Sequence, residues 1–118
     1  MRSKPDALGL LSLIYTNLGE YDKALEFGQK RLILVQSLKK PKLEVEPLIG
    51  LGDVYNHLDE FQKAIGFTQQ ALKIAKEIKN SNLEAEALKK LSTAYAGKGD
   101  YQQALESAQQ VLVIAEKN

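Results

Sequence analysis

The sequence predicts an all-α protein made of three similar helix-turn-helix units that stack one after another. The first observation behind this fold class is repetition. The stretch YTNLGEYDKALEF at residues 15–27 returns forty residues later as YNHLDEFQKAIGF and then as YAGKGDYQQALES. The second is that apolar residues recur at helical spacing, while no stretch alternates in the manner of a half-buried strand. Repetition at a fixed interval of about 20–50 residues is typical of a solenoid.

The three units are residues 1–40, 41–80 and 81–118, which align without a gap, and we expect them to form a single domain. Two helices in each unit give about six helices in all. Six columns of the alignment hold the same residue in every unit. They are Leu8, Leu11, Tyr15, Ala24, Gln29 and Leu32, together with the residues forty and eighty positions further along the chain.

Unit 1 shows the pattern of both helices. Its first helix is predicted by apolar residues at helical spacing, namely Leu8, Leu11, Tyr15 and Leu18. Gly19 follows, and Asp59 and Gly99 occupy the same column in the other units. Gly, and less readily Asp, accepts the left-handed conformation that ends a helix, so we expect a tight turn there. The second helix is predicted by a second stripe, which consists of Ala24, Leu25, Gly28, Leu32 and Val35.

The start of the first helix differs between the units. In unit 3, Ser81 and Glu84 have the spacing of a capping box, so Ser81 is expected at the N-cap. In unit 1, Ser3 is a weaker candidate for the same role. In unit 2, Pro47 replaces the alanine of the other units. Either that helix begins at about Pro47, which we favour, or a short turn precedes a kink there.

Residue size predicts how the helices pack. Ser12, Gly52 and Ser92 share one column, and another column is alanine in every unit. Because small side chains let two backbones approach, we expect the closest contact of each hairpin at these two columns. The tyrosine column that begins at Tyr15 should supply large buried side chains.

Composition excludes several classes of function. The 118 residues contain no cysteine, which removes disulfides, thiolate metal sites and a cysteine nucleophile. With His57 as the single histidine, one chain cannot build a multi-histidine zinc site, and we expect no metal and no cofactor. Lys and Arg number 16 against 15 Asp and Glu, and no broad basic face predicts nucleic-acid binding. No apolar run approaches the ~20 residues that cross a bilayer, so we expect no membrane insertion.

The first residues are similar to a signal peptide, because MRSK precedes the apolar stretch ALGLLSLIY. However, Leu8, Leu11 and Tyr15 return in both later units, so we expect this segment to belong to the folded domain. Absence of cysteine is compatible with a reducing compartment, and we expect a cytoplasmic protein.

The recurring pattern Leu-x-x-Leu-[Ser/Gly]-x-x-Tyr, followed by Gly-[Glu/Asp]-Tyr and then Ala, resembles the tetratricopeptide repeat. The resemblance covers essentially the whole chain and implies a right-handed superhelical solenoid. The chain departs from the family pattern in its Trp position, which holds Leu8, Leu48 and Leu88, and in lacking the final Pro. Its forty-residue period fits a second helix extended by another turn. HEAT and armadillo repeats have similar lengths but do not explain this register of Tyr, Gly and Ala.

The resemblance implies a protein–protein interaction scaffold, because the first helices of such arrays line a concave groove that holds an extended or helical peptide. Candidate groove residues lie opposite the Leu-Leu-Tyr stripe of each first helix. They are Asp6, Leu13 and Asn17 in unit 1, Glu46, Ile49, Asp53, Asn56 and His57 in unit 2, and Glu86, Lys89 and Thr93 in unit 3. An ordinary solvated surface is the alternative explanation of these positions.

The candidate groove favours a particular kind of partner. An apolar residue of the partner would dock near Leu13 and Ile49. Lys or Arg beside it would meet the acidic part of the groove, which is Asp6, Glu46, Asp53 and Glu86. The carboxylate clamp with which some family members hold chaperone C-termini is not expected, because only Lys89 fits its pattern.

Catalysis is not expected. Asp53 and His57 are four residues apart on one predicted helix and could pair as a general-base dyad. No motif marks an activated nucleophile, so we interpret them as a polar pair near a helix C-terminus.

The last helix contains five apolar residues in succession, from Val111 to Ala115. Solenoids need polar terminal caps, because an uncovered unit exposes an apolar face. Either this chain is a fragment of a longer array, or two copies cover each other's ends as a homodimer through the C-terminal helix. The alternative to a groove-binding scaffold is therefore an architectural or self-associating segment with no specific groove ligand.

Overall fold

The computed structural model describes residues 3–117, which contain six α-helices and one short 3-10 helix and include no strand. In chain order these are α1 (Lys4–Asn17), α2 (Tyr21–Ser37), η1 (Pro41–Glu44), α3 (Val45–His57), α4 (Phe61–Glu77), α5 (Ser81–Lys98) and α6 (Tyr101–Lys117). The prediction of an all-α repeat is confirmed. Within the same range, none of the helices combines the length and the apolar character needed to cross a membrane.

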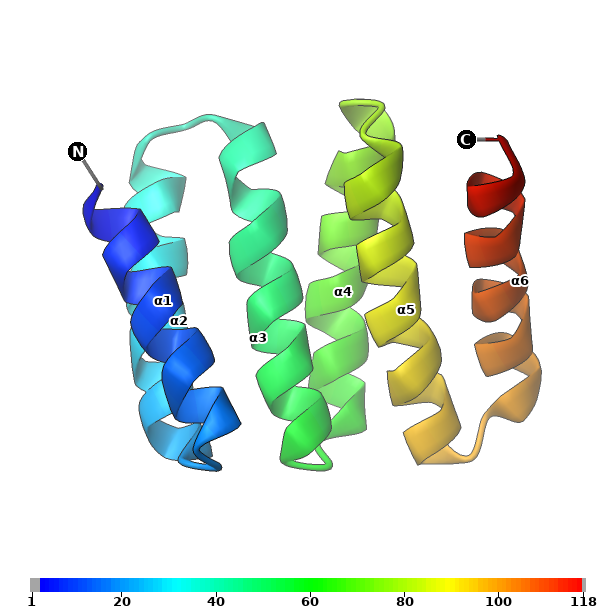
Figure 1. Ribbon diagram of the computed structural model, residues 1–118, viewed down its shortest axis with the longest axis horizontal. Helices are drawn as coiled ribbons and strands as arrows, with labels where there is room; N and C mark the ends of the chain where they lie inside the picture. Colours follow the sequence, from blue (N-terminus) through cyan, green and yellow to red (C-terminus); the bar gives the residue numbers. More distant parts are fainter. Residues whose placement is uncertain (1–2, 118) are drawn as a thin grey trace.

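The helices form three hairpins, α1/α2, α3/α4 and α5/α6, which follow one another along the longest dimension of a molecule of 38 × 29 × 20 Å (Figure 1). In this view α1, α3 and α5 stand in front of α2 and α4. The central helix α3 contacts α1, α2, α4 and α5. Because α3 is enclosed from several sides, side chains around most of its circumference are buried.

Each hairpin turns at a residue in the left-handed conformation, as the sequence predicts. The φ angle is 78° at Gly19, 58° at Asp59 and 86° at Gly99. The N–H of the next residue donates to the carbonyl of the tyrosine column, at 2.9, 2.9 and 2.8 Å in units 1, 2 and 3. Lys39 and Lys79 adopt the same conformation after α2 and α4, with φ of 53° and 57°. Those two turns were not predicted, because lysine rarely adopts positive φ.

The predicted N-cap residue is right for α1 and wrong for α5. Ser3 caps α1, and its Oγ accepts from the N–H of Asp6 at 3.3 Å. The prediction that Ser81 caps α5 is wrong. Asn80 is the N-cap, and its side-chain oxygen accepts from the N–H of Leu83 at 3.0 Å. Asn is as good a cap as Ser, so the helix begins one residue earlier than the capping-box spacing suggests.

Unit 2 combines the two expected starts. The helix α3 begins at Val45, two residues before Pro47, so the favoured late start is right to within two residues. The 3-10 helix Pro41–Glu44 precedes it and is the short turn of the other alternative. Pro47 lies in the first turn of α3, where its missing N–H leaves no helical hydrogen bond unmade.

The predicted close approach within each hairpin is confirmed. The hydroxyl of Ser12 donates to the carbonyl of Ala24, and that of Ser92 to the carbonyl of Ala104, both at 2.8 Å. In units 1 and 3 the donor lies on the first helix of the hairpin. In unit 2 it lies on the second helix, because Gly52 has no hydroxyl. Thr68 lies on α4 and donates to the carbonyl of Ala64 at 2.7 Å, and its methyl group fills the space beside Gly52.

Placing serine at Gly52 is expected to destabilise the fold by about 1–3 kcal/mol, because its Cβ would lie 2.5 Å from Cγ2 of Thr68. The double variant Gly52→Ser/Thr68→Ala copies the Ser92 and Ala108 pair of unit 3. We expect the free energy of unfolding of the double variant to exceed the value that the two single effects predict when added, by about 1 kcal/mol or more. Urea unfolding of the four proteins of this cycle measures the coupling, and additive effects would contradict a direct contact.

The core is centred on unit 2. Leu48, Leu51 and Tyr55 of α3 are buried, whereas Leu11 and Tyr15, in the columns of Leu51 and Tyr55, are partly exposed. The expected burial of the tyrosine column is therefore met fully only at Tyr55. Within residues 3–117, unit 2 has a neighbouring unit on each side, whereas units 1 and 3 each have one.

Candidate functional site

A groove of about 370 Å³ lies between α1 and α3, and α2 forms its floor. Its lining includes Asp6, Leu10 and Leu13 on α1, Arg31 on α2, and Gly50 and Asp53 on α3. Apolar side chains, a guanidinium and two carboxylates therefore border one depression. Its volume lies within the usual range of ligand pockets.

Arg31 reaches the groove because Gly9 has no side chain. A Cβ on Gly9 would lie 2.8 Å from Cζ of Arg31, so the guanidinium lies against the backbone of α1. The same two columns in unit 2 hold Ile49 and Ala71, with the large residue on the first helix and the small one on the second. No carboxylate of residues 3–117 forms an ion pair with Arg31, so its guanidinium donors are available beside the groove that it lines.

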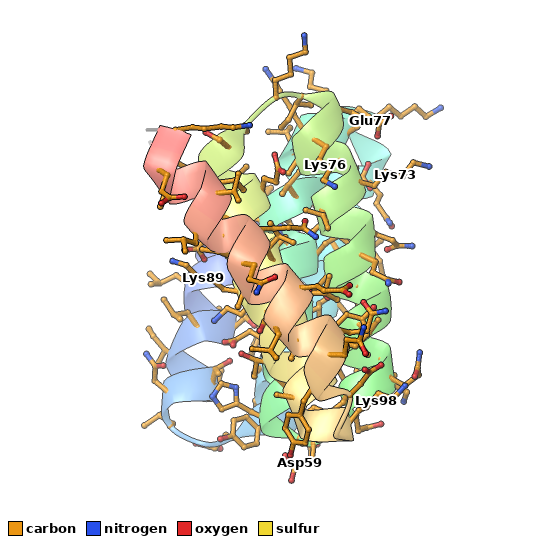
Figure 2. All side chains as sticks on the ribbon, turned by 90° about the vertical axis from the view of Figure 1, so that its right-hand side faces the viewer. Asp59, Lys73, Lys76, Glu77, Lys89 and Lys98 are labelled. Carbon is orange, nitrogen blue, oxygen red and sulfur yellow. The ribbon has the colours of Figure 1, made fainter. Side chains whose placement is uncertain are left out.

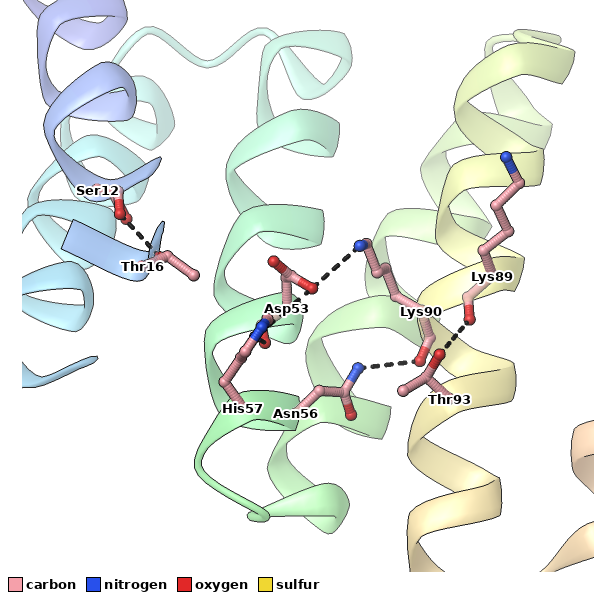
Figure 3. Close-up of polar contacts among 8 residues, drawn as sticks. All are labelled: Ser12, Thr16, Asp53, Asn56, His57, Lys89, Lys90 and Thr93. Atoms are coloured by element: carbon pink, nitrogen blue, oxygen red, sulfur yellow. Dashed lines mark hydrogen bonds and ion pairs between the residues drawn. The ribbon is translucent and has the colours of Figure 1, made fainter. Parts of the chain in front are cut away.

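Asp53 links α3 to α5 (Figure 3). One carboxylate oxygen of Asp53 lies 3.0 Å from Nζ of Lys90 and 3.9 Å from Nδ1 of His57. The side chains of Asp53 and Lys90 are 28% and 33% exposed, so solvent screens this pair only in part. The predicted acidic group at Asp53 is therefore largely compensated by a lysine of the next unit.

The arrangement of Asp53 and His57 favours a structural role over proton transfer. Nδ1 of His57 lies 2.9 Å from the main-chain carbonyl of Asp53, one turn earlier on α3, and donates to it when it carries the proton. The imidazole also lies against the ring of Tyr21, with 5.3 Å between the ring centroids. No three side chains among residues 3–117 are grouped as metal ligands.

Two predicted groove residues are buried rather than accessible. Ile49 is 7% exposed and belongs to the main core cluster, so the expectation that it anchors a partner is corrected. Asn56 is buried between α3 and α5, where its Nδ2 donates to the carbonyl of Lys90 at 3.1 Å. Both lie on α3, which other helices enclose, so a position that is accessible on α1 can be buried on α3.

The other predicted residues are spread over a wider surface than the groove. Asp6, Leu13 and Asp53 line it together. The remaining six are exposed beyond it: Asn17 and His57 at the ends of α1 and α3, Glu46 near the start of α3, and Glu86, Lys89 and Thr93 along α5.

Three further residues, Leu10, Arg31 and Lys90, were not predicted, although the structure places them in or beside the groove. Arg31 could have been found, since its column holds Ala71 and Val111 in the other units. A charged residue in an otherwise apolar column indicates a local change in packing. Lys90 lies one residue beyond the predicted column, and no pattern in the chain marks it.

A family model described as tetratricopeptide repeat matches residues 4–77 and 43–117. A search of the curated proteins gives no significant match. Among solved structures, the TPR domain of Arabidopsis FLU has 23% sequence identity and a TM-score of 0.89, with 97% of this chain and 96% of that chain covered.

Two further solved structures are similar. TPR-like repeats of a Podosopora anserina protein named as a kinesin light chain have 19% identity and a TM-score of 0.85 over 99% of this chain and 58% of that one. The N-terminal domain of stress-induced protein-1 (STI-1) from C. elegans has 18% identity and a TM-score of 0.74 over 97% and 88%. At these identities the likeness concerns the fold.

Proposed function

This chain belongs to the tetratricopeptide repeat family, and we propose that residues 1–118 form one domain, with repeats 1–40, 41–80 and 81–118, that binds a segment of a partner protein. The fold generally mediates protein–protein interaction, and the family is typically a non-enzymatic scaffold. The observation that carries the proposal is the groove between α1 and α3, which is lined by both apolar and charged side chains. We further propose that the protein works in the cytoplasm.

The partner segment we propose carries Lys or Arg beside an apolar residue. Asp6, Glu46 and Glu86 occupy one column and form an exposed acidic row near the starts of α1, α3 and α5. Acidic residues near a helix start also interact favourably with the helix dipole, so a role in stability is the competing explanation. Leu10 and Leu13, exposed beside the groove, replace Ile49 as the apolar anchor of the site. Arg31 supplies donors for a main-chain carbonyl of the partner.

Reversing the charge of the acidic row tests this proposal. The variant Asp6→Lys/Glu46→Lys/Glu86→Lys should bind labelled peptides that contain Lys or Arg next to Leu, Ile or Phe on the order of tenfold more weakly than the parent. Fluorescence anisotropy at low and high salt measures the loss. The matched control Glu26→Lys/Glu77→Lys/Glu106→Lys makes the same charge change on α2, α4 and α6, at exposed positions.

Two outcomes of this experiment would contradict the proposal. Equal weakening in the control and the groove variant would show an effect of net charge alone. Tight binding of peptides with acidic C-termini by the parent would show instead that the groove binds carboxylates. The proposal predicts the opposite, because the acidic row repels a carboxylate.

Self-association is a second candidate, which we propose on a different observation. Tyr101, Leu105, Leu112 and Val113 of α6 are exposed, and a homodimer through this helix would cover them. In that case the protein acts as an architectural segment, with or without a groove ligand.

A further inference from the structure

We propose that copies of this chain associate head to tail, so that α1 of one copy docks on α5 and α6 of another in the way α5 docks on α3 and α4. This inference replaces the homodimer contact of the self-association candidate with a head-to-tail contact, and it does not depend on peptide binding in the groove. The occupant is a second copy of the chain, and the internal junctions between units are the template for the contact.

The head face consists of Leu11, Ile14 and Leu18 on α1. Their exposed fractions are 38%, 45% and 64%. In the later units the columns of Leu11 and Ile14 are closed, because Leu91 and Ala94 of α5 are buried against the preceding unit. In the part of the chain that the structure describes, the head face is thus a junction surface that no preceding unit covers.

The tail face consists of Tyr101, Leu105 and Leu112 on α6, the helix at the front of Figure 2. These three side chains are 66%, 63% and 58% exposed. Their counterparts in unit 2 are Phe61, Ile65 and Leu72, which are buried or partly buried. The tail face is therefore the opposite half of the same junction.

The junction between units 2 and 3 shows that these two half-surfaces fit each other. Ile65 from one side and Leu91 and Ala94 from the other belong to one core cluster, and Leu72 packs against it. Nε2 of Gln69 donates to the hydroxyl of Tyr95 at 3.1 Å across the same junction. Both partners of this hydrogen bond belong to invariant columns, so Gln109 and Tyr15 can form it between copies.

The aromatic column at the start of each second helix makes a third junction contact. Tyr21 lies against His57 of the next unit, with 5.3 Å between ring centroids. Phe61 covers Gly97 of the next unit, where an added Cβ would clash with the ring. Tyr101 has no following unit in residues 3–117. Asn17, next to Leu18 of the head face, occupies the column of His57 and Gly97 and would meet Tyr101 of another copy.

Head-to-tail docking joins two different surfaces, so it does not close after two copies. A two-fold dimer through α6 would instead join two tail faces and would leave each head face free. Because the residues of the head face and of the tail face are exposed, one substitution can block each face without disturbing the core.

The test uses a head-blocked variant, Ile14→Lys, and a tail-blocked variant, Leu105→Lys. The parent should increase in average mass with concentration beyond that of a dimer in sedimentation equilibrium. Each variant alone should be monomeric, because its intact face has no partner surface. Their mixture should give a one-to-one dimer that grows no further. The control Leu43→Lys, at an exposed leucine of η1, should associate like the parent.

Three results would overturn the proposal. They are a parent that stays monomeric up to about 1 mM, a head-blocked variant that still dimerises, and a mixture of the two variants that stays monomeric while circular dichroism shows both to be folded. Peptide anisotropy on the monomeric variants separates this inference from groove binding. A parent that stays monomeric yet binds the peptide overturns head-to-tail association and leaves groove binding standing, whereas a parent that associates without binding the peptide does the reverse.

Discussion

Replacing Tyr55 by alanine is expected to lower the free energy of unfolding by about 3–5 kcal/mol, the largest effect of any single substitution considered for this protein. The ring is 7% exposed and stacks on Phe67, with 5.5 Å between centroids and an interplanar angle of 5°. Truncation removes this contact and leaves a cavity that α3 cannot close, because helices on several sides hold it in place. Urea unfolding monitored by circular dichroism measures the change.

The control for this substitution is Tyr15→Ala. Tyr15 also stacks on a phenylalanine, Phe27, at 5.6 Å, but its ring is partly exposed at the edge of the stack. We therefore expect a smaller loss, because exposed side chains are already partly hydrated in the folded state. Equal losses at Tyr15 and Tyr55 would contradict the placement of the core in unit 2.

Replacing Leu51 by alanine is expected to cost about 2–5 kcal/mol. Leu51 is 1% exposed and belongs to a cluster that includes Leu32 of unit 1 and Ala87 of unit 3. The effect thus reports on the contact between units as well as within one.

The matched control is Leu11→Ala in the same column of unit 1. Because Leu11 is 38% exposed and has no preceding unit in residues 3–117, we expect a loss of about 1 kcal/mol or less at protein concentrations that keep the chain monomeric. Thermal and urea unfolding of both variants give the comparison. A loss at Leu11 as large as that at Leu51 would show that burial in this column does not come from the neighbouring unit.

The repeat made most of the fold predictable. Gly19, Asp59 and Gly99 mark turns by a local property, because few other residues adopt the left-handed conformation without cost. Ser12 and Ala24 mark close contacts by their size. Such signals act within a few residues or within one hairpin, so they can be recognised in the sequence.

The candidate site was harder to predict, because it depends on contacts between units. Ile49 lies on α3, in a column predicted to face the groove. It is nevertheless buried, because α3 has neighbouring helices on both sides. The pairing of Asp53 with Lys90 joins residues of different helices and has no counterpart in the repeat pattern. Arg31 enters the groove only because Gly9 lies above it. Residues that differ between units therefore determine the site, and their partners are known only once the units are placed.

The site of partner binding can be located directly by NMR. Amide chemical shifts of the ¹⁵N-labelled protein are followed during titration with a peptide that carries Lys or Arg beside a leucine. We predict that the largest shifts arise at the groove on α1 and α3, around Asp6, Leu13 and Asp53. Shifts confined to α2, α4 and α6, or none at saturating peptide, would contradict the proposal that the groove binds this class of partner.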